Sequence, residues 1–158
     1  MKSKIFKIIV WSVTLLWLCM IFYFSSKPST ESLQESGDIL VHLNQLEESE
    51  IYNTTDSRVF DLHYYVRKSA HFILYSGLGF LTALSIVLIR YKSYTSYVIA
   101  WLAAALYGVS DEAHQYFIPG RGTTFADIKL DTISALAGVV TAAVIVELYR
   151  RYGSKSGG

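Results

Sequence analysis

Hydrophobic residues in this chain fall into four long runs, which are separated by shorter segments rich in polar and charged residues. The runs cover residues 5–24, 69–89, 94–110 and 132–149, and the third is the shortest. An α-helix needs about 20 mostly apolar residues to cross a bilayer. The pattern therefore predicts an all-α, polytopic membrane protein built as a four-transmembrane-helix bundle.

The segment between the first two runs, residues 25–68, has a different pattern and is expected to form a loop outside the membrane. Within its GDILVHLNQLEESE stretch, Ile39, Leu43 and Leu46 recur at helical spacing, with acidic residues after them. Such spacing is typical of an amphipathic helix. We expect a short outer helix that lies at the membrane interface or caps the bundle.

The composition supports this class of protein. Hydrophobic residues make up 52% of the chain and charged residues only 17%, whereas soluble domains carry about 25% charged residues. The net charge is +1 and no basic stripe is present, so we expect no nucleic-acid partner. Cys19 is the only cysteine, which excludes an internal disulfide and a zinc site made of thiolates.

Lysine and arginine are distributed unequally between the two ends of the predicted helices. Of the 14 basic residues, 8 fall in the three very short segments on the side of the N-terminus, and 6 are spread over two longer loops. Short segments rich in these residues stay in the cytoplasm. We expect both termini to be cytoplasmic, with residues 1–150 as one multi-pass membrane domain and 151–158 as a cytoplasmic tail. The first run is too long for a cleaved signal peptide, so it is expected to remain as an anchor.

Ionisable residues collect where three of the runs reach the outer face. In KSAHFILY, the i, i+3, i+7 spacing puts Lys68, His71 and Tyr75 on one face of a helix. The stretch SDEAHQYFIPGR extends the third run, and Asp127 and Asp131 lie one turn apart at the start of the fourth. Ionisable groups are costly at membrane depth and commonly mark a functional site. The predicted ligand-binding residues are Lys68, His71, Tyr75, Asp111, Glu112, Gln115, Arg121, Asp127 and Asp131.

Some of these residues also have a simpler structural interpretation. Thr124 and Asp127 are spaced as a helix N-terminal capping box, and Asp131 in the next turn gains from the helix dipole. Arg121 stands in PGRG, a turn signal, and could be an exposed loop charge, while Arg67 is interpreted as an anchor to lipid headgroups. Convergence from three helix ends favours a binding site over these separate roles.

Small residues recur in the last three runs and predict close helix packing. Gly and Ala let helix backbones approach closely in membrane bundles. Such contact would bring the three polar helix ends within side-chain reach of one another. The residues concerned are Gly77, Gly79, Gly108, Ala135, Gly138 and Ala142.

The motifs FSSKPSTESLQES, KSAHFILYSGLGFL and SDEAHQYFIPGRGTTFADIKLDTISALAG resemble, in this order, the pattern of the VanZ family. That pattern has serines after helix one, H-x-x-x-Y in helix two, and S-D-E-x-x-Q-x-F-x-P-x-R before a last helix rich in glycine. The resemblance covers nearly the whole chain and is weakest over residues 37–60. It adds to the polar set Ser25, Ser26, Ser32, Ser36, Ser110 and Pro119.

Two positions depart from the VanZ pattern. Asp131 stands where the family usually has asparagine, and the added charge needs a proton or a cation beside it. Ser134 stands where a glycine is expected, which would loosen the packing of the last helix slightly.

The resemblance implies a bacterial plasma-membrane protein of the cell envelope, associated with low-level resistance to the lipid-tailed glycopeptide teicoplanin. The first functional hypothesis is an outward-facing polar pocket that binds a lipid-linked ligand. Candidate partners are an undecaprenyl-linked cell-wall precursor, its carrier-lipid phosphate or a lipoglycopeptide, besides membrane lipids. Lys68, His71, His114 and Arg121 would contact a phosphate or carboxylate, and no cofactor and no metal are expected.

The alternative is a membrane-embedded hydrolase or transferase acting on a lipid-linked envelope precursor, and the sequence leaves open whether any reaction is catalysed. Its catalytic residues would be His71, Glu112 and His114, with acid–base work by Glu112 and a histidine. A divalent metal held by these residues with Asp127 or Asp131 is a less favoured version. Transport ranks third, because the last three runs lack ionisable residues at mid-membrane.

Overall fold

The computed structural model describes residues 2–89 and 93–153, without the side chains of residues 2, 3 and 153. The described residues form helices and no strands, so the predicted all-α class is confirmed. The elements are α1 (Lys2–Ser25), α2 (Ser29–His42), the short 3-10 helix η1 (Glu48–Glu50), α3 (Ser57–Ile89), α4 (Tyr94–Gln115) and α5 (Phe125–Gly153).

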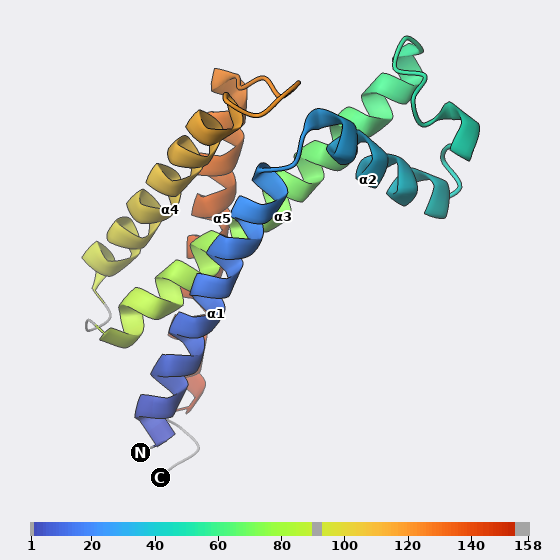
Figure 1. Ribbon diagram of the computed structural model, residues 1–158. Coiled ribbons are helices and arrows are strands. Elements are labelled where there is room, and N and C mark those ends of the chain that lie inside the picture. Colours follow the sequence, from blue (N-terminus) through green and yellow to red (C-terminus); the bar gives the residue numbers. More distant parts are fainter. Residues whose placement is uncertain (1, 90–92, 154–158) are drawn as a thin grey trace.

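The long helices alternate in direction (Figure 1). The chain rises along α1, returns along the oblique α3, rises again along α4 and returns along α5, so the start of α1 and the end of α5 lie at the same end of the molecule. The loop between α4 and α5 lies at the opposite end. Helix α2 and the first turns of α3 project to one side there, beyond the bundle of α1, α4 and α5.

The prediction of four membrane spans is wrong in its count. Among the described residues, three helices are long and apolar enough to cross a membrane: Lys4–Ser25, Ser57–Ile89 and Phe125–Tyr152. The predicted span 94–110 lies in α4, which has 22 residues. Helix α4 falls short in apolarity because it begins with four hydroxyl-bearing residues, Tyr94–Tyr97, and ends in SDEAHQ.

The helices also extend beyond the predicted runs at the polar end. Helix α3 begins at Ser57, inside the segment 25–68 expected as a loop, and α5 begins at Phe125 rather than near 132. Helix α5 continues through the first three residues of the predicted tail 151–158, while 154–158 lie outside the described residues. The extra turns of α3 and α5 carry Lys68 and Asp127 on regular helix.

The outer segment forms a helix, as its periodicity indicates, but the helix is α2 and ends at His42. Asn44 has a positive φ of 55°, a conformation that stops a helix, so Leu46 lies beyond it. Leu40, Leu46 and Val59 are buried together as a small core between α2 and α3. Ile39 and Leu43 remain exposed.

Helices α3 and α5 pack with their backbones in contact, as the small residues predict. A Cβ on Gly79 would collide with the carbonyl of Ala135, and one on Gly138 would collide with the carbonyl of Ser76. Buried alanines continue this packing toward the cytoplasmic end predicted from the basic residues. Close approach of these two helices fixes the distance between the polar side chains at their other ends.

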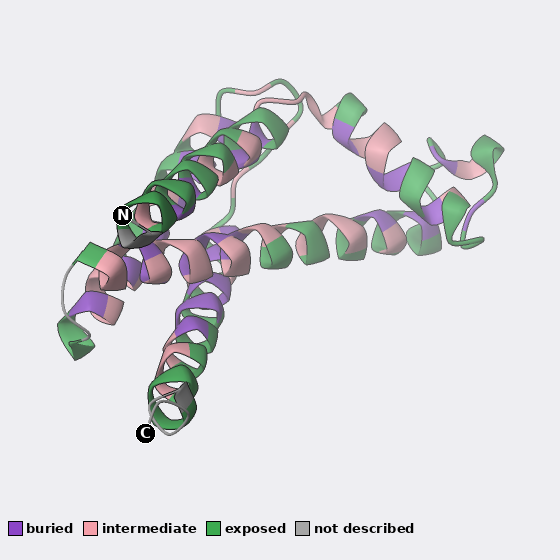
Figure 2. Ribbon diagram, turned by 90° about the horizontal axis from the view of Figure 1, so that it is seen from below, coloured by how far each residue is buried: buried purple, intermediate pink, exposed green. Residues whose placement is uncertain are grey.

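The outward surfaces of the long helices are exposed (Figure 2), and many of the exposed side chains are large and apolar. Leu15 and Leu16 on α1 are 63% and 68% exposed, and Val140 on α5 is 52% exposed. Water does not favour so much exposed apolar surface, whereas lipid chains do. The apolar outer surface agrees with helices that lie in a bilayer.

Candidate functional site

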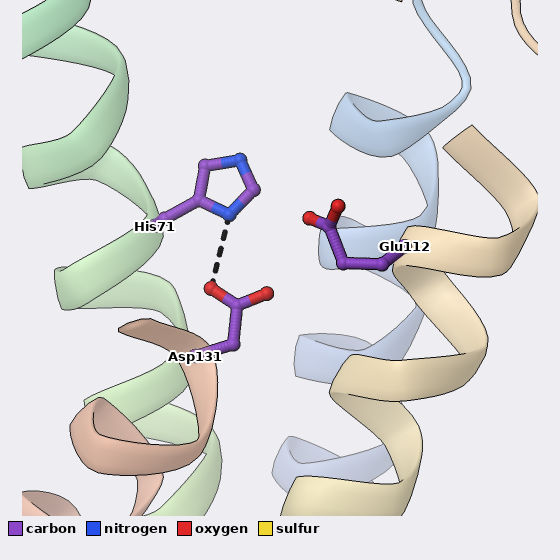
Figure 3. Close-up of side chains that lie close together, drawn as sticks. All are labelled: His71, Glu112 and Asp131. Carbon is purple, nitrogen blue, oxygen red and sulfur yellow. Dashed lines mark hydrogen bonds and ion pairs between the residues drawn. The ribbon is translucent and has the colours of Figure 1, made fainter. Parts of the chain in front are cut away.

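Three side chains from three helices meet at the polar end of the bundle (Figure 3). His71 comes from α3, Glu112 from α4 and Asp131 from α5, and one nitrogen or oxygen of each lies within 4.8 Å of the others. His71 Nδ1 lies 3.1 Å from Asp131 Oδ1. Asp131 is fully buried and Glu112 is 2% exposed. We call these residues the three-helix cluster.

Gly108 lets the three helices approach at this level. A Cβ placed on Gly108 would lie 3.3 Å from the Cβ of Asp131 and 3.3 Å from Cε1 of Tyr75. Even a methyl group there would require its neighbours to move by a few tenths of an ångström, so a small residue suits this close approach. The small residue one turn before Glu112 therefore sets the position of the Glu112 carboxylate.

A second set of polar side chains lies beside the cluster and is joined by hydrogen bonds. The hydroxyl of Tyr75 donates to Asp111 Oδ2 over 2.8 Å, and Gln115 Nε2 donates to the same oxygen over 3.0 Å. Tyr75, Asp111 and Gln115 are all at least 95% buried. Two donors satisfy this buried carboxylate oxygen, and the bond from Tyr75 holds α3 against α4.

Arg121 extends this set from the α4–α5 loop to the end of α1. Its Nη1 donates to Gln115 Oε1 over 3.0 Å, its Nε donates to the carbonyl of Lys27 over 3.0 Å, and its Nη2 donates to the carbonyl of Phe24 over 3.1 Å. Burial, followed by the charge of Arg67, lowers the pKa of Arg121 from its ordinary value. An arginine stays charged even so, and Arg121 is therefore more than an exposed loop charge.

Lys68 and Asp127 form an ion pair between α3 and α5. Asp127 is also the capping residue that its spacing predicts, since Thr124 Oγ1 donates to Asp127 Oδ2 over 2.8 Å and the Thr124 backbone N–H donates to the same oxygen over 3.2 Å. One carboxylate thus caps α5 and pairs with α3. The structural and the polar-site interpretations of Asp127 are compatible.

A pocket of about 540 Å³ opens next to these side chains, between the end of α1, α2, α3 and the end of α4. Its polar part includes three serines of the FSSKPSTESLQES motif, and its apolar part includes Ile21, Leu74 and Val66. The polar lining residues are Ser25, Ser32, Glu35, Ser36, Asp38, Arg67, His71, Tyr75, Asp111, Gln115 and Arg121. Lys68, Glu112, Asp127 and Asp131 are not among the lining residues.

The polar residues and the pocket fall within one recognised sequence family. The family model described as VanZ/LLP1 matches residues 10–146. This chain belongs to the VanZ-like family. No curated protein and no solved structure matches it.

The VanZ-like match extends from within α1 to within α5 and therefore contains every residue of the three-helix cluster and of the pocket. The serines at the end of α1 and after it that match the family pattern lie in two different surroundings. Ser25, Ser32 and Ser36 line the pocket, whereas the hydroxyl of Ser26 lies 3.2 Å from Nε2 of His114.

His114 lies apart from the cluster in this VanZ-like protein. Besides its contact with Ser26, its ring stacks on Phe22 with 4.9 Å between the ring centroids. Phe22 lies in the last turn of α1, and Ser26 directly follows that helix. The structure therefore places His114 against α1, and His71 is the histidine that lies with Glu112 and Asp131.

Arg67 is the pocket residue that the sequence interpretation missed. It was assigned to lipid headgroups, but it lines the pocket together with Arg121. The signal was present in the sequence, because Arg67 and His71 are spaced i, i+4 and share a helix face. Glu35 and Asp38 were missed as well, and only the fold of α2 over the pocket brings them there.

Proposed function

We propose that this VanZ-like protein binds the acidic group of a lipid-linked molecule in its pocket, at the outer leaflet of the bacterial plasma membrane. The observation that carries the proposal is the pocket of about 540 Å³ at the polar end of the bundle, which combines apolar walls with Arg67, His71 and Arg121. The apolar part would take a lipid chain or tail, and the basic part would take a phosphate or carboxylate.

The size and lining of the pocket support a ligand of this kind. Small-molecule sites have volumes of about 300–1,000 Å³ and are mostly apolar, with a few polar groups that orient the ligand. Arginine is well suited to phosphate and carboxylate because its planar guanidinium donates pairs of hydrogen bonds. Arg121 makes three hydrogen bonds to protein, which leaves two of its five N–H groups for a ligand.

Two ligand sources share this chemistry. The phosphate of an undecaprenyl-linked wall precursor or of its carrier lipid is one, and the carboxylate of a lipoglycopeptide such as teicoplanin is the other. Sequestering a lipid-tailed glycopeptide, or altering access to its target, would connect the pocket to low-level glycopeptide resistance. The distribution of basic residues, which predicts that the pocket faces outward, agrees with either source.

Binding can be measured on the full chain in detergent with three probes: undecaprenyl phosphate, the uncharged undecaprenol and teicoplanin. Undecaprenyl phosphate is expected to bind at least tenfold more tightly than undecaprenol. Arg67→Gln should weaken phosphate binding by about 10- to 100-fold, the range of a charge-assisted hydrogen bond, and leave undecaprenol binding unchanged. Lys129→Gln is the control, because Lys129 is exposed on α5 and is not a pocket residue.

Two results would count against the proposal. One is equal affinity for undecaprenyl phosphate, undecaprenol and teicoplanin in the wild type and in Arg67→Gln. The other is an equal loss of binding in Arg67→Gln and Lys129→Gln, which would indicate a non-specific electrostatic effect.

Catalysis on a lipid-linked precursor is the second candidate, and one observation favours it. Glu112 lies within 4.8 Å of the His71–Asp131 pair, and a carboxylate beside an oriented histidine can exchange protons with a bound ester. Release of phosphate from undecaprenyl pyrophosphate tests this candidate. Turnover that Glu112→Gln abolishes while binding persists would favour the enzyme, and no turnover by the wild type would leave binding alone.

A further inference from the structure

We propose that His71, Glu112 and Asp131 form a binding site for one divalent metal ion. The three side chains come from α3, α4 and α5 and point toward one shared space (Figure 3). One imidazole nitrogen and two carboxylate oxygens make a mixed set of ligands that transition metals accept in proteins. The site lies behind the pocket, which His71 alone of the three residues lines.

The distances fit ligands of a common ion. Metal bonds to histidine nitrogen and carboxylate oxygen are about 2.0–2.2 Å long, so two donors at right angles on one ion lie about 3.0 Å apart, and opposite donors lie about 4.2 Å apart. His71 Nδ1 and Asp131 Oδ1 are 3.1 Å apart, as neighbouring ligands would be. The donor atoms of all three residues lie within 4.8 Å, so a small rotation of the Glu112 side chain completes the set.

Asp131 provides an independent indication. It is fully buried, yet its second carboxylate oxygen, Oδ2, has no hydrogen-bond partner among the described residues. Figure 3 shows this oxygen directed toward the side of Glu112, into the space that the three side chains share. Buried carboxylate oxygens normally accept hydrogen bonds or coordinate metals. A cation in that space would satisfy the oxygen.

The hydrogen bonds and ion pairs of two neighbouring basic side chains go to partners outside the cluster, although Arg67 and Lys68 both attract Glu112 through space. Lys68 pairs with Asp127, and Arg121 donates to Gln115 and to two backbone carbonyls. Two buried carboxylates, Glu112 and Asp131, therefore share His71 as their contacting basic group in the cluster. Two carboxylates so close together cannot both ionise without a counter-charge, and a divalent ion would supply it.

The ligand types select among metals. Imidazole favours zinc, iron, nickel and copper, whereas carboxylates suit manganese and magnesium as well. One histidine with two carboxylates fits Zn²⁺ or Mn²⁺ best. Three protein ligands leave further coordination positions open, and because His71 lines the pocket, these positions would reach the acidic group of a pocket ligand. This last step rests on the proposed function, whereas the ion site does not.

The site can be tested without any lipid. The full chain in detergent is stripped with a chelator and titrated with Mn²⁺, whose free concentration is read from its electron paramagnetic resonance signal, and Zn²⁺ is then added as a competitor. We expect one Mn²⁺ per chain, displaced by Zn²⁺. Asp131→Asn and Glu112→Gln should each weaken binding by at least tenfold. Both substitutions keep the size of the side chain and an acceptor oxygen, and helical circular dichroism checks that the variants fold.

Asp38→Asn is the matched control, because it removes a carboxylate that lines the neighbouring pocket and lies outside the three-helix cluster, and its Mn²⁺ affinity should equal that of the wild type. Less than half an ion bound per folded chain would overturn the proposal. So would equal losses in Asp38→Asn and Asp131→Asn, which would indicate diffuse attraction to acidic groups.

The same preparations separate this inference from the proposed function. Undecaprenyl phosphate binding is measured on the chelator-stripped and on the Mn²⁺-loaded protein. Stoichiometric Mn²⁺ without any lipid binding would reject the pocket function and support the ion site. Lipid binding by a protein that takes up no Mn²⁺ would reject the ion site and support the pocket function. Tighter lipid binding after loading would support the contact between the ion and the ligand.

Discussion

The Nη1 of Arg121 lies 3.0 Å from the side-chain oxygen of Gln115, and this contact ties the α4–α5 loop to the interior of the bundle. The same guanidinium reaches two carbonyls at the end of α1. Gln115 in turn donates to Asp111, which accepts from Tyr75 on α3. A chain of hydrogen bonds thus joins the polar ends of three helices and one loop.

Arg121→Lys is expected to destabilise the protein by about 1–3 kcal/mol, since an ammonium group cannot replace three diverging hydrogen bonds from one plane. In thermal unfolding in detergent this corresponds to a decrease of the melting temperature of several degrees. Arg150→Lys is the control, because Arg150 makes an exposed ion pair with Glu147, and such pairs contribute about 0–1 kcal/mol. Equal effects of the two substitutions would contradict the role assigned to Arg121.

Tyr75→Phe should cost about 1.5–3 kcal/mol, because it removes a hydrogen bond to a buried carboxylate. Tyr107→Phe is matched to it, since the Tyr107 hydroxyl donates to the neutral carbonyl of Leu18 over 2.9 Å, and should cost about 0.5–1.5 kcal/mol. Thermal or denaturant unfolding of both variants measures the difference. A smaller effect at Tyr75 than at Tyr107 would contradict the stabilising role assigned to the Tyr75–Asp111 hydrogen bond.

Gly138→Ala should destabilise the bundle by about 1–3 kcal/mol, the usual cost of added volume in a tightly packed interior. The new methyl group would collide with the carbonyl of Ser76 and force α3 and α5 apart. Gly122→Ala is the control, because nothing lies within 4 Å of a Cβ at Gly122. Because this contact also fixes the distance between the polar ends of α3 and α5, Gly138→Ala should weaken Mn²⁺ binding. Reduced stability with unchanged Mn²⁺ affinity would show that the packing at Gly138 does not determine the geometry of the three-helix cluster.

Cysteine labelling tests the orientation predicted from the basic residues. Cys19 is exposed, so it is first replaced by alanine, which leaves a chain without cysteine. Thr54→Cys, in the segment between η1 and α3, should react with a membrane-impermeant maleimide on intact bacterial cells. Lys4→Cys, near the start of α1, should react only after the membrane is opened. The reverse pattern would place the pocket in the cytoplasm and exclude a ligand of the outer leaflet.

The apolar, membrane-spanning parts of α1, α3 and α5 could be read from the chain, because lipid as a solvent imposes long runs without charge, whereas the polar extensions of α3 and α5 could not. The same rule wrongly predicted α4 as a fourth membrane span. A helix that packs between others need not be apolar enough for lipid on its own, so Ser96, Ala100 and Gly108 of α4 are buried against protein. Neighbouring helices, which no local pattern encodes, determine the surroundings of such a helix.

The sequence also predicted part of the candidate site. Spacing placed Lys68, His71 and Tyr75 on one face and brought Asp111, Glu112 and Asp131 to the same end. Spacing could not choose between His71 and His114 as the partner of the acids, because each lies near a helix end beside carboxylates. The packing of α1 against α4 decides this, because His114 contacts Ser26 and stacks on Phe22 and therefore lies away from Asp131.

By itself, the sequence determined that this is a helical membrane protein of the VanZ-like family with ionisable side chains gathered at one end. Helix periodicity and the cost of charge in lipid act locally, so both can be predicted from short stretches of the sequence. Only the tertiary structure decided that Asp131 lies beside His71 and that α2 closes a pocket over Arg67. Those relations depend on how closely α3 and α5 approach at Gly79 and Gly138, a distance set by packing between segments far apart in the chain.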